Sequence, residues 1–131
     1  MTDLGHTIDF LVYLGIAVVL LAAFLAAYTL LTPIREWELI RAGNAAVSLA
    51  LSGAMIGFAL PLASAIAHSD SVTESVITAA IALVIQLGAY AAMRLLRRDA
   101  TAALERGDMA EGILCAALSV TLGILNAACL T

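Results

Sequence analysis

Charged side chains interrupt this apolar chain at only a few places, and the stretches between them are long. Uncharged runs of 25, 28, 19 and 20 residues lie between Asp9 and Arg35, between Arg41 and Asp70, between Glu74 and Arg94, and after Glu111. About 20 apolar residues in a helix cross a hydrocarbon core of about 30 Å. No run alternates with a period of two, as a barrel strand would. We therefore predict four transmembrane helices, at about 10–32, 44–67, 75–96 and 109–130.

Composition supports a membrane protein and excludes soluble classes. Of the 131 residues, 63% are hydrophobic and 12% are charged, and the mean hydropathy is +1.06. Soluble domains contain roughly 45–50% apolar and about 25% charged residues, and a small one cannot hide so much apolar surface. Six basic residues are too few for a face that binds nucleic acid. We predict a single all-α integral membrane domain, 1–131, embedded in the lipid bilayer.

The six basic residues are all arginines, and they lie in two of the connecting segments. Segment 33–43 contains two and segment 94–108 contains four, whereas the N-terminal tail, the 68–74 connection and the C-terminus contain none. Because positively charged loops stay in the cytoplasm, both segments are predicted to be cytoplasmic and both termini periplasmic or exterior. The first run lacks the positive flank of a signal peptide and is too long for its apolar core, so we predict a membrane helix.

The first arginine-bearing segment has the pattern of a short amphipathic helix. Proline at position 33 suits the first turn of a helix. Apolar residues recur at every third position, at Ile34, Trp37 and Ile40. Charged residues are expected elsewhere on the surface, at Arg35, Glu36, Glu38 and Arg41. The pattern predicts an anchor at the membrane interface. The alternative is a docking surface for a cytosolic protein, formed by Trp37, Arg35, Arg41, Arg97 and Arg98.

A glycine followed by Asn or Asp precedes the second and the fourth run in equivalent places. The pairs are Gly43-Asn44 and Gly107-Asp108, which lie 64 residues apart (107 − 43). Glycine ends one helix at such a corner, and the Asn or Asp side chain caps the next. Because 64 residues is about half of the chain, the order of elements predicts two helical hairpins related as a parallel internal repeat.

Small residues follow one face of the second and the fourth predicted helix. Such residues let membrane helices approach closely. The second helix carries Ser48, Ser52, Gly53 and Gly57. The fourth carries Gly112, Ala116, Ser119, Gly123 and Asn126 at helical spacing. We expect these faces to pack against each other or against another subunit of a homo-oligomer.

Polar residues on the third predicted helix are candidates for an interior role. Gln86, Tyr90 and Arg94 share one stripe of that helix, and Gln86 lies near the midplane. Ser119 comes to a similar depth on the fourth helix. An amide in lipid needs partners, so Gln86 either clamps helices together or lines a pore. Arg94 is expected to pair with Glu111 near the cytoplasmic face.

A second polar group is expected toward the exterior end of the second helix. Pro61 has no N–H, so the carbonyl of Gly57 loses its usual partner. Ser64 and Asn126 fall at a similar depth. The three groups are predicted either to form a small polar vestibule or to make hydrogen bonds between helices.

No catalytic or metal-binding pattern occurs in the sequence. His6 and His68 lie outside the spans, and no nucleophile, phosphate-binding or zinc motif is present. Cys115 and Cys129 lie in the last span, where we expect them to pack as small apolar residues. We therefore predict a protein that is not an enzyme and that has neither a metal nor a cofactor.

Four stretches of the chain resemble a known family. They are 36–46 (EWELIRAGNAA), 61–66 (PLASAI), 81–87 (IALVIQL) and 125–129 (LNAAC). In this order they are similar to the YjfL-like bacterial inner-membrane proteins, whose domain has no assigned function. The resemblance implies four helices in the bacterial inner membrane, arranged as two related hairpins. It also implies an association with envelope-stress coat proteins of the phage-shock kind.

Two functions are consistent with these patterns. The first is a non-enzymatic anchor or sensor in the membrane, whose arginine-bearing segments face a cytosolic partner. The alternative is a homo-oligomeric ion channel or small-solute transporter, because four short helices enclose little space by themselves. The pore would then be lined by Gln86, Ser119, Asn126 and the kink at Pro61.

Overall fold

A computed structural model describes residues 2–31, 35–97 and 99–130 and contains six helices in these ranges. They are α1 (Thr2–Leu31), α2 (Glu36–Arg41), α3 (Ala45–Ala67), α4 (Val72–Leu96), α5 (Asp99–Glu105) and α6 (Met109–Cys129). Four of them, α1, α3, α4 and α6, are long and apolar enough to cross a membrane. The prediction of an all-α membrane protein with four spanning helices is therefore confirmed. Pro33 and Arg98 lie outside the described residues.

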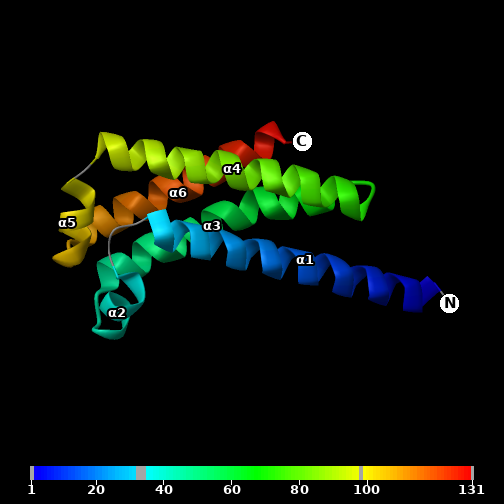
Figure 1. Cartoon of the computed structure of the whole chain (residues 1–131), viewed down its shortest axis with the longest axis horizontal. Coiled ribbons are helices and arrows are strands. Elements are labelled where there is room, and N and C mark those ends of the chain that lie inside the picture. The colour runs from blue at the N-terminus through cyan, green and yellow to red at the C-terminus, as the bar shows by residue number, and fades with distance from the viewer. Residues whose placement is uncertain (1, 32–34, 98, 131) are drawn as a thin grey trace.

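The two short helices gather at one end of the bundle (Figure 1). At this end α2 joins α1 to α3, and α5 joins α4 to α6. The N-terminus, the turn between α3 and α4, and the C-terminus lie toward the opposite end (Figure 1). We call the end with α2 and α5 the arginine-bearing end, because all six arginines belong to residues 35–41 and 94–106.

Two helices begin earlier than the uncharged runs suggest. Helix α1 starts at Thr2 rather than near residue 10, and α4 starts at Val72 rather than at residue 75. The side chain of Ser71 accepts a hydrogen bond from the Glu74 N–H (3.1 Å), and Glu74 accepts one from the Asp70 N–H (3.1 Å). Such reciprocal capping starts a helix within polar residues, which a count of uncharged positions does not include.

The two corners that follow α2 and α5 have the same backbone geometry. Gly43 and Gly107 have positive φ angles of 91° and 81°. Their N–H groups donate to the carbonyls of Ile40 and Leu104, three residues back in each case. Asn44 and Asp108 then cap α3 and α6 with their side chains. Each hydrogen bond of one corner recurs 64 residues later, which favours the predicted repeat. The relation between whole hairpins stays a prediction.

Helix α1 packs less closely than the other spans. Only 6% of its most apolar window is buried, against 50% for α3. Its N-terminal half leaves the bundle, and an apolar groove between α1 and α3 opens there (Figure 1). Its contact with the bundle centres on Phe24, which is fully buried.

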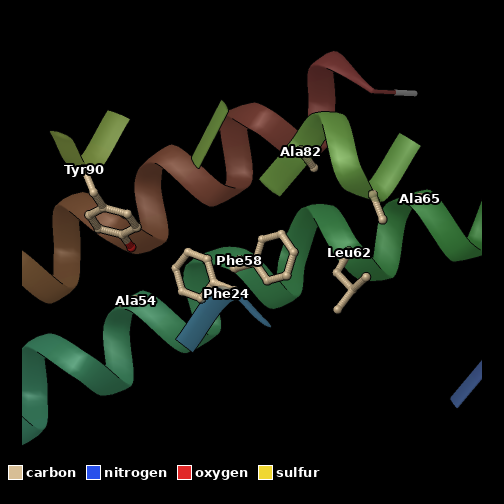
Figure 2. Packing of buried hydrophobic residues seen from close by; sticks show 8 residues of the cluster. Phe24, Ala54, Phe58, Leu62, Ala65, Ala82 and Tyr90 are labelled. Atoms are coloured by element: carbon tan, nitrogen blue, oxygen red, sulfur yellow. The ribbon is translucent and has the colours of Figure 1, made fainter. Parts of the chain in front are cut away.

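A cluster of aromatic rings joins α1 to α3 and α4. The ring of Phe24 stacks on Phe58 with centroids 4.7 Å apart, and Tyr90 lies 5.9 Å from Phe24 (Figure 2). Tyr28 adds an edge contact to Tyr90 at 5.1 Å. Such ring pairs add to the packing energy of the apolar surface they cover. The cluster therefore holds the C-terminal half of α1 against the bundle.

Candidate functional site

Helices α3 and α6 form the tightest contact in the bundle, and small residues make it possible. A side chain at Gly112 would come within 2.7 Å of the Ala46 carbonyl oxygen. A Cβ at Gly53 would overlap Ala116, and one at Gly123 would overlap Gly57. These contacts advance in the same direction along both helices, so α3 and α6 run parallel. Ser48 is half-buried and Ser52 is exposed, so Ser52 lies outside this contact within the single chain.

Pro61 has a direct structural consequence at this contact. In a helix the carbonyl of Gly57 would accept the N–H of residue 61, and proline has none. Gly123 of α6 lies against this carbonyl and leaves no room for a Cβ. A Cα–H group at such short range is a weak donor. The freed carbonyl thus faces the neighbouring helix and is not part of an open vestibule.

Three polar side chains form a buried cluster between α4 and α6, which we call the amide cluster. The Nδ2 of Asn126 donates to the Gln86 Oε1 (3.3 Å) and to the Ala82 carbonyl (3.2 Å). The Nε2 of Gln86 donates to the carbonyl of Ser119 (3.4 Å). The hydroxyl of Ser119 donates to Cys115 in its own helix (2.8 Å). All three side chains are at least nine-tenths buried, so the cluster holds two helices together inside one chain.

The amide cluster differs from the grouping expected from sequence. Asn126 was expected beside Ser64, but it bonds to Gln86, whereas the Ser64 hydroxyl donates to the Ala127 carbonyl (3.4 Å). Ser119 and Asn126 lie two turns apart on one face of α6. The long side chain of Gln86 reaches between them. Tyr90 lies one turn beyond Gln86, and its hydroxyl is buried without a hydrogen bond among the described residues.

We expect substitutions at Gln86 and Asn126 to be energetically coupled. Gln86→Leu and Asn126→Leu each leave a buried amide without a partner. Hydrogen bonds between membrane helices contribute about 0.6 kcal/mol on average and up to about 1.7 kcal/mol. A double-mutant cycle on the free energy of unfolding in mixed micelles should therefore give a coupling of about 1 kcal/mol. Thr121→Val is the control, because that hydroxyl is exposed and bonds only within α6. Strictly additive effects would contradict the cluster.

Charged groups at the arginine-bearing end are arranged differently from expectation. Arg97, and not Arg94, pairs with Glu111, through distances of 2.7 and 2.8 Å. Arg97 follows the last residue of α4 and points back to the first turn of α6, while Arg94 donates to the Thr101 hydroxyl (3.4 Å). The hydrogen bonds to Glu111 raise the pKa of Arg97. The pair therefore keeps its charges at physiological pH.

Helix α2 also departs from the surface pattern predicted for it. Glu36 is 3% exposed, although it was expected on the surface. Trp37 is 51% exposed and Arg35 forms an exposed ion pair with Glu38 (3.5 Å). A six-residue helix cannot turn every apolar residue inward when its orientation is set by the corner that follows it. The exposed indole is thus available to the membrane interface or to a protein.

Side chains that could bind a metal do not gather in the described part of the chain. No group of three or more His, Cys, Asp or Glu residues comes together there. Cys115 is half-buried and Cys129 is exposed, and both are free thiols. The features with the most organised polar chemistry are therefore the amide cluster and the arginine-bearing end.

Comparisons with known proteins agree with this description. Residues 1–130 match the family described as Domain of Unknown Function (DUF350). The chain is 36% identical to the UPF0719 inner membrane protein YjfL of Escherichia coli (strain K12), over 100% of this chain and 99% of that protein. It is 28% identical to the UPF0719 transmembrane protein YshE of Bacillus subtilis (strain 168), over 95% and 94% of the two chains.

No solved structure matches the chain. The family and these two relatives are described by their membrane location and not by a catalytic activity. The full-length match confirms the resemblance drawn from the sequence motifs. The chain belongs to the DUF350 family of membrane proteins of unknown function.

Proposed function

We propose that the protein is a non-enzymatic component of the bacterial inner membrane that presents its arginine-bearing end to a cytosolic protein. The observation that carries this proposal is the position of α2 and α5, which lie together at one end of the bundle (Figure 1). Both helices are short, and each connects two spanning helices. Together they form the largest surface outside the four spans.

The two short helices are fixed to the bundle and to each other. The side chain of Asn44 donates to the carbonyls of Leu104 (2.9 Å) and Glu105 (3.3 Å), which joins the start of α3 to the end of α5. The ion pair of Arg97 and Glu111 joins the end of α4 to the start of α6. A surface held in this way offers a fixed shape to a partner, so little ordering is required when the partner binds.

The distribution of charge supports an orientation with this end in the cytoplasm. The six arginines and six of the ten acidic residues belong to this end, so its net charge is near zero. The other four acidic residues, Asp3, Asp9, Asp70 and Glu74, belong to the opposite end without any arginine. Orientation follows the basic residues rather than net charge. Both termini would then be periplasmic.

The alternative of a channel receives less support. Gln86 and Asn126 bond to each other and are buried within one chain, so a lumen lined by them would require these bonds to open. A homo-oligomer stays a prediction. Liposomes that contain the purified protein should show no flux of common ions above that of empty liposomes, and an ion flux abolished by Gln86→Leu would favour the channel instead.

A photo-cross-linking amino acid in place of Trp37 tests the docking proposal in living cells. We expect one discrete protein adduct, identified by mass spectrometry as a cytosolic protein, because the Trp37 side chain is exposed at this end. The same probe in place of Val72, which is exposed at the opposite end, is the control and should not capture that protein.

A second variant separates docking from simple proximity. Trp37→Ala should lower recovery of the identified partner about tenfold, as expected for an aromatic anchor worth at least 1.4 kcal/mol. The amount of protein in the membrane should stay unchanged. Lipid adducts alone at position 37 would show that Trp37 only anchors the chain at the interface, and the docking proposal would then fail.

A further inference from the structure

A small cavity opens at the arginine-bearing end, between the ends of the spanning helices. Its volume is about 60 Å³, and residues of α1, α4, α5 and α6 line it. For scale, a water molecule takes about 30 Å³ of the liquid, so the cavity has room for a small ion or a few waters. The polar groups that line it include Tyr90, Arg94, Arg97, Thr101 and Ser119. The remaining walls are mostly apolar.

The two arginines of this cavity have different partners. The guanidinium of Arg97 is paired with both carboxylate oxygens of Glu111. Arg94 donates only to the neutral hydroxyl of Thr101, and no carboxylate lies within ion-pair distance of it among residues 35–97 and 99–130. Arginine stays protonated in proteins. The cavity therefore carries one positive charge that the described side chains do not balance.

The hydroxyl of Tyr90 is a second group that requires a partner. Tyr90 is 9% exposed and lines the cavity, and its hydroxyl makes no hydrogen bond in the described part of the chain. A buried donor without an acceptor is unfavourable. Tyr90 and Arg94 are one turn apart on α4, so they face the same space. An unbalanced cation and an unused donor on one wall favour an oxyanion.

We propose that this cavity binds a phosphate group, held by the guanidinium of Arg94 and the hydroxyl of Tyr90. Arg94 lies in the last turn of α4, at the level where a spanning helix meets lipid headgroups. Basic pockets between spanning helices bind anionic headgroups. Guanidinium groups match the geometry of phosphate oxygens. The phosphate belongs either to an anionic membrane lipid or to free inorganic phosphate. The site does not require the docking of a protein partner.

Lipid retention measures the first source. Protein purified from nanodiscs of phosphatidylcholine with a minor fraction of phosphatidylglycerol is analysed by native mass spectrometry. We expect one retained phosphatidylglycerol per chain, and a loss of about tenfold or more in Arg94→Gln, as for a charge-assisted hydrogen bond. Arg41→Gln is the matched control, because Arg41 is exposed at the same end and does not line the cavity.

Titration with inorganic phosphate measures the second source. Isothermal titration calorimetry is carried out on the protein in a zwitterionic detergent without anionic lipid. Binding that is lost in Arg94→Gln and kept in Arg41→Gln assigns the site to free phosphate, whereas lipid retention alone assigns it to a headgroup. If neither ligand binds in a manner that depends on Arg94, or if Arg41→Gln lowers binding equally, the proposal is overturned.

Two further variants keep the test valid if Arg94→Gln lowers stability. Tyr90→Phe keeps the ring in its aromatic cluster and removes only the hydroxyl, and it should weaken binding roughly threefold to tenfold. Arg94→Lys keeps the charge and should recover part of the binding that Arg94→Gln loses. Unchanged binding in Tyr90→Phe together with no recovery in Arg94→Lys would overturn the assignment of these two groups.

Discussion

Gly123→Ala is expected to destabilise the protein by about 1–3 kcal/mol, the typical cost of overpacking a close contact. The added Cβ would overlap the carbonyl oxygen, the carbonyl carbon and the Cα of Gly57. All three are backbone atoms, so no side chain can rotate away and α3 must move from α6. A lower midpoint of unfolding, followed by circular dichroism in mixed micelles, measures the effect.

Gly88→Ala is the matched control for this prediction. Gly88 lies on an exposed face of α4, and a Cβ there meets nothing within 4 Å. Alanine favours a helix over glycine by up to about 1 kcal/mol, so the control should unfold at the same midpoint or a slightly higher one. Equal losses in the two variants would mean that helix propensity, and not the contact with α3, determines the result.

The close contact of α3 and α6 also shows how far sequence patterns reach. Helical spacing placed Gly112 and Gly123 on one face of α6 before any contact was known, because a face is determined by the period of the helix. The partner of that face remained open between α3 and another subunit. Periodicity describes one helix at a time, and two parallel helices 64 residues apart leave no local signal of their pairing.

The polar contacts that differed from expectation depend on how helices rotate and slide against one another. Depth along each helix grouped Asn126 with Ser64, but the rotation of α4 turned Gln86 toward Asn126. Arg94 and Arg97 are three residues apart, so a small change in where α4 ends decides which of them meets Glu111. The length of a helix follows from its sequence more readily than its rotation does.

The aromatic cluster had no signal in the sequence at all, since Phe24, Phe58 and Tyr90 are far apart in the chain. Their stacking requires the packing of three helices. Single aromatic residues in apolar runs are common, and their positions alone do not show which face they occupy. This cluster is nevertheless the main attachment of α1 in the structure.

Phe24→Ala is therefore expected to detach α1 from the bundle. Phe-to-Ala changes in soluble cores cost about 3–5 kcal/mol. Lipid chains cover an exposed apolar face without the penalty of water, so we expect a smaller loss of about 2–3 kcal/mol in the free energy of unfolding. Phe10→Ala makes the same change on the same helix where the ring is 63% exposed, and it should leave the free energy of unfolding nearly unchanged.

A distance measurement separates detachment of α1 from a general loss of stability. Spin labels at Leu14 and Ile56, both exposed, report the separation of α1 and α3 once Cys115 and Cys129 are replaced by alanine. In Phe24→Ala the distribution of distances between the labels should broaden, because Phe24 is the one residue of α1 that is fully buried among those described. A narrow, unchanged distribution would mean that the covalent link through α2 and the apolar contacts around Phe24 hold α1 in place without the ring. Under that outcome the aromatic cluster would contribute to stability but would not determine the position of α1.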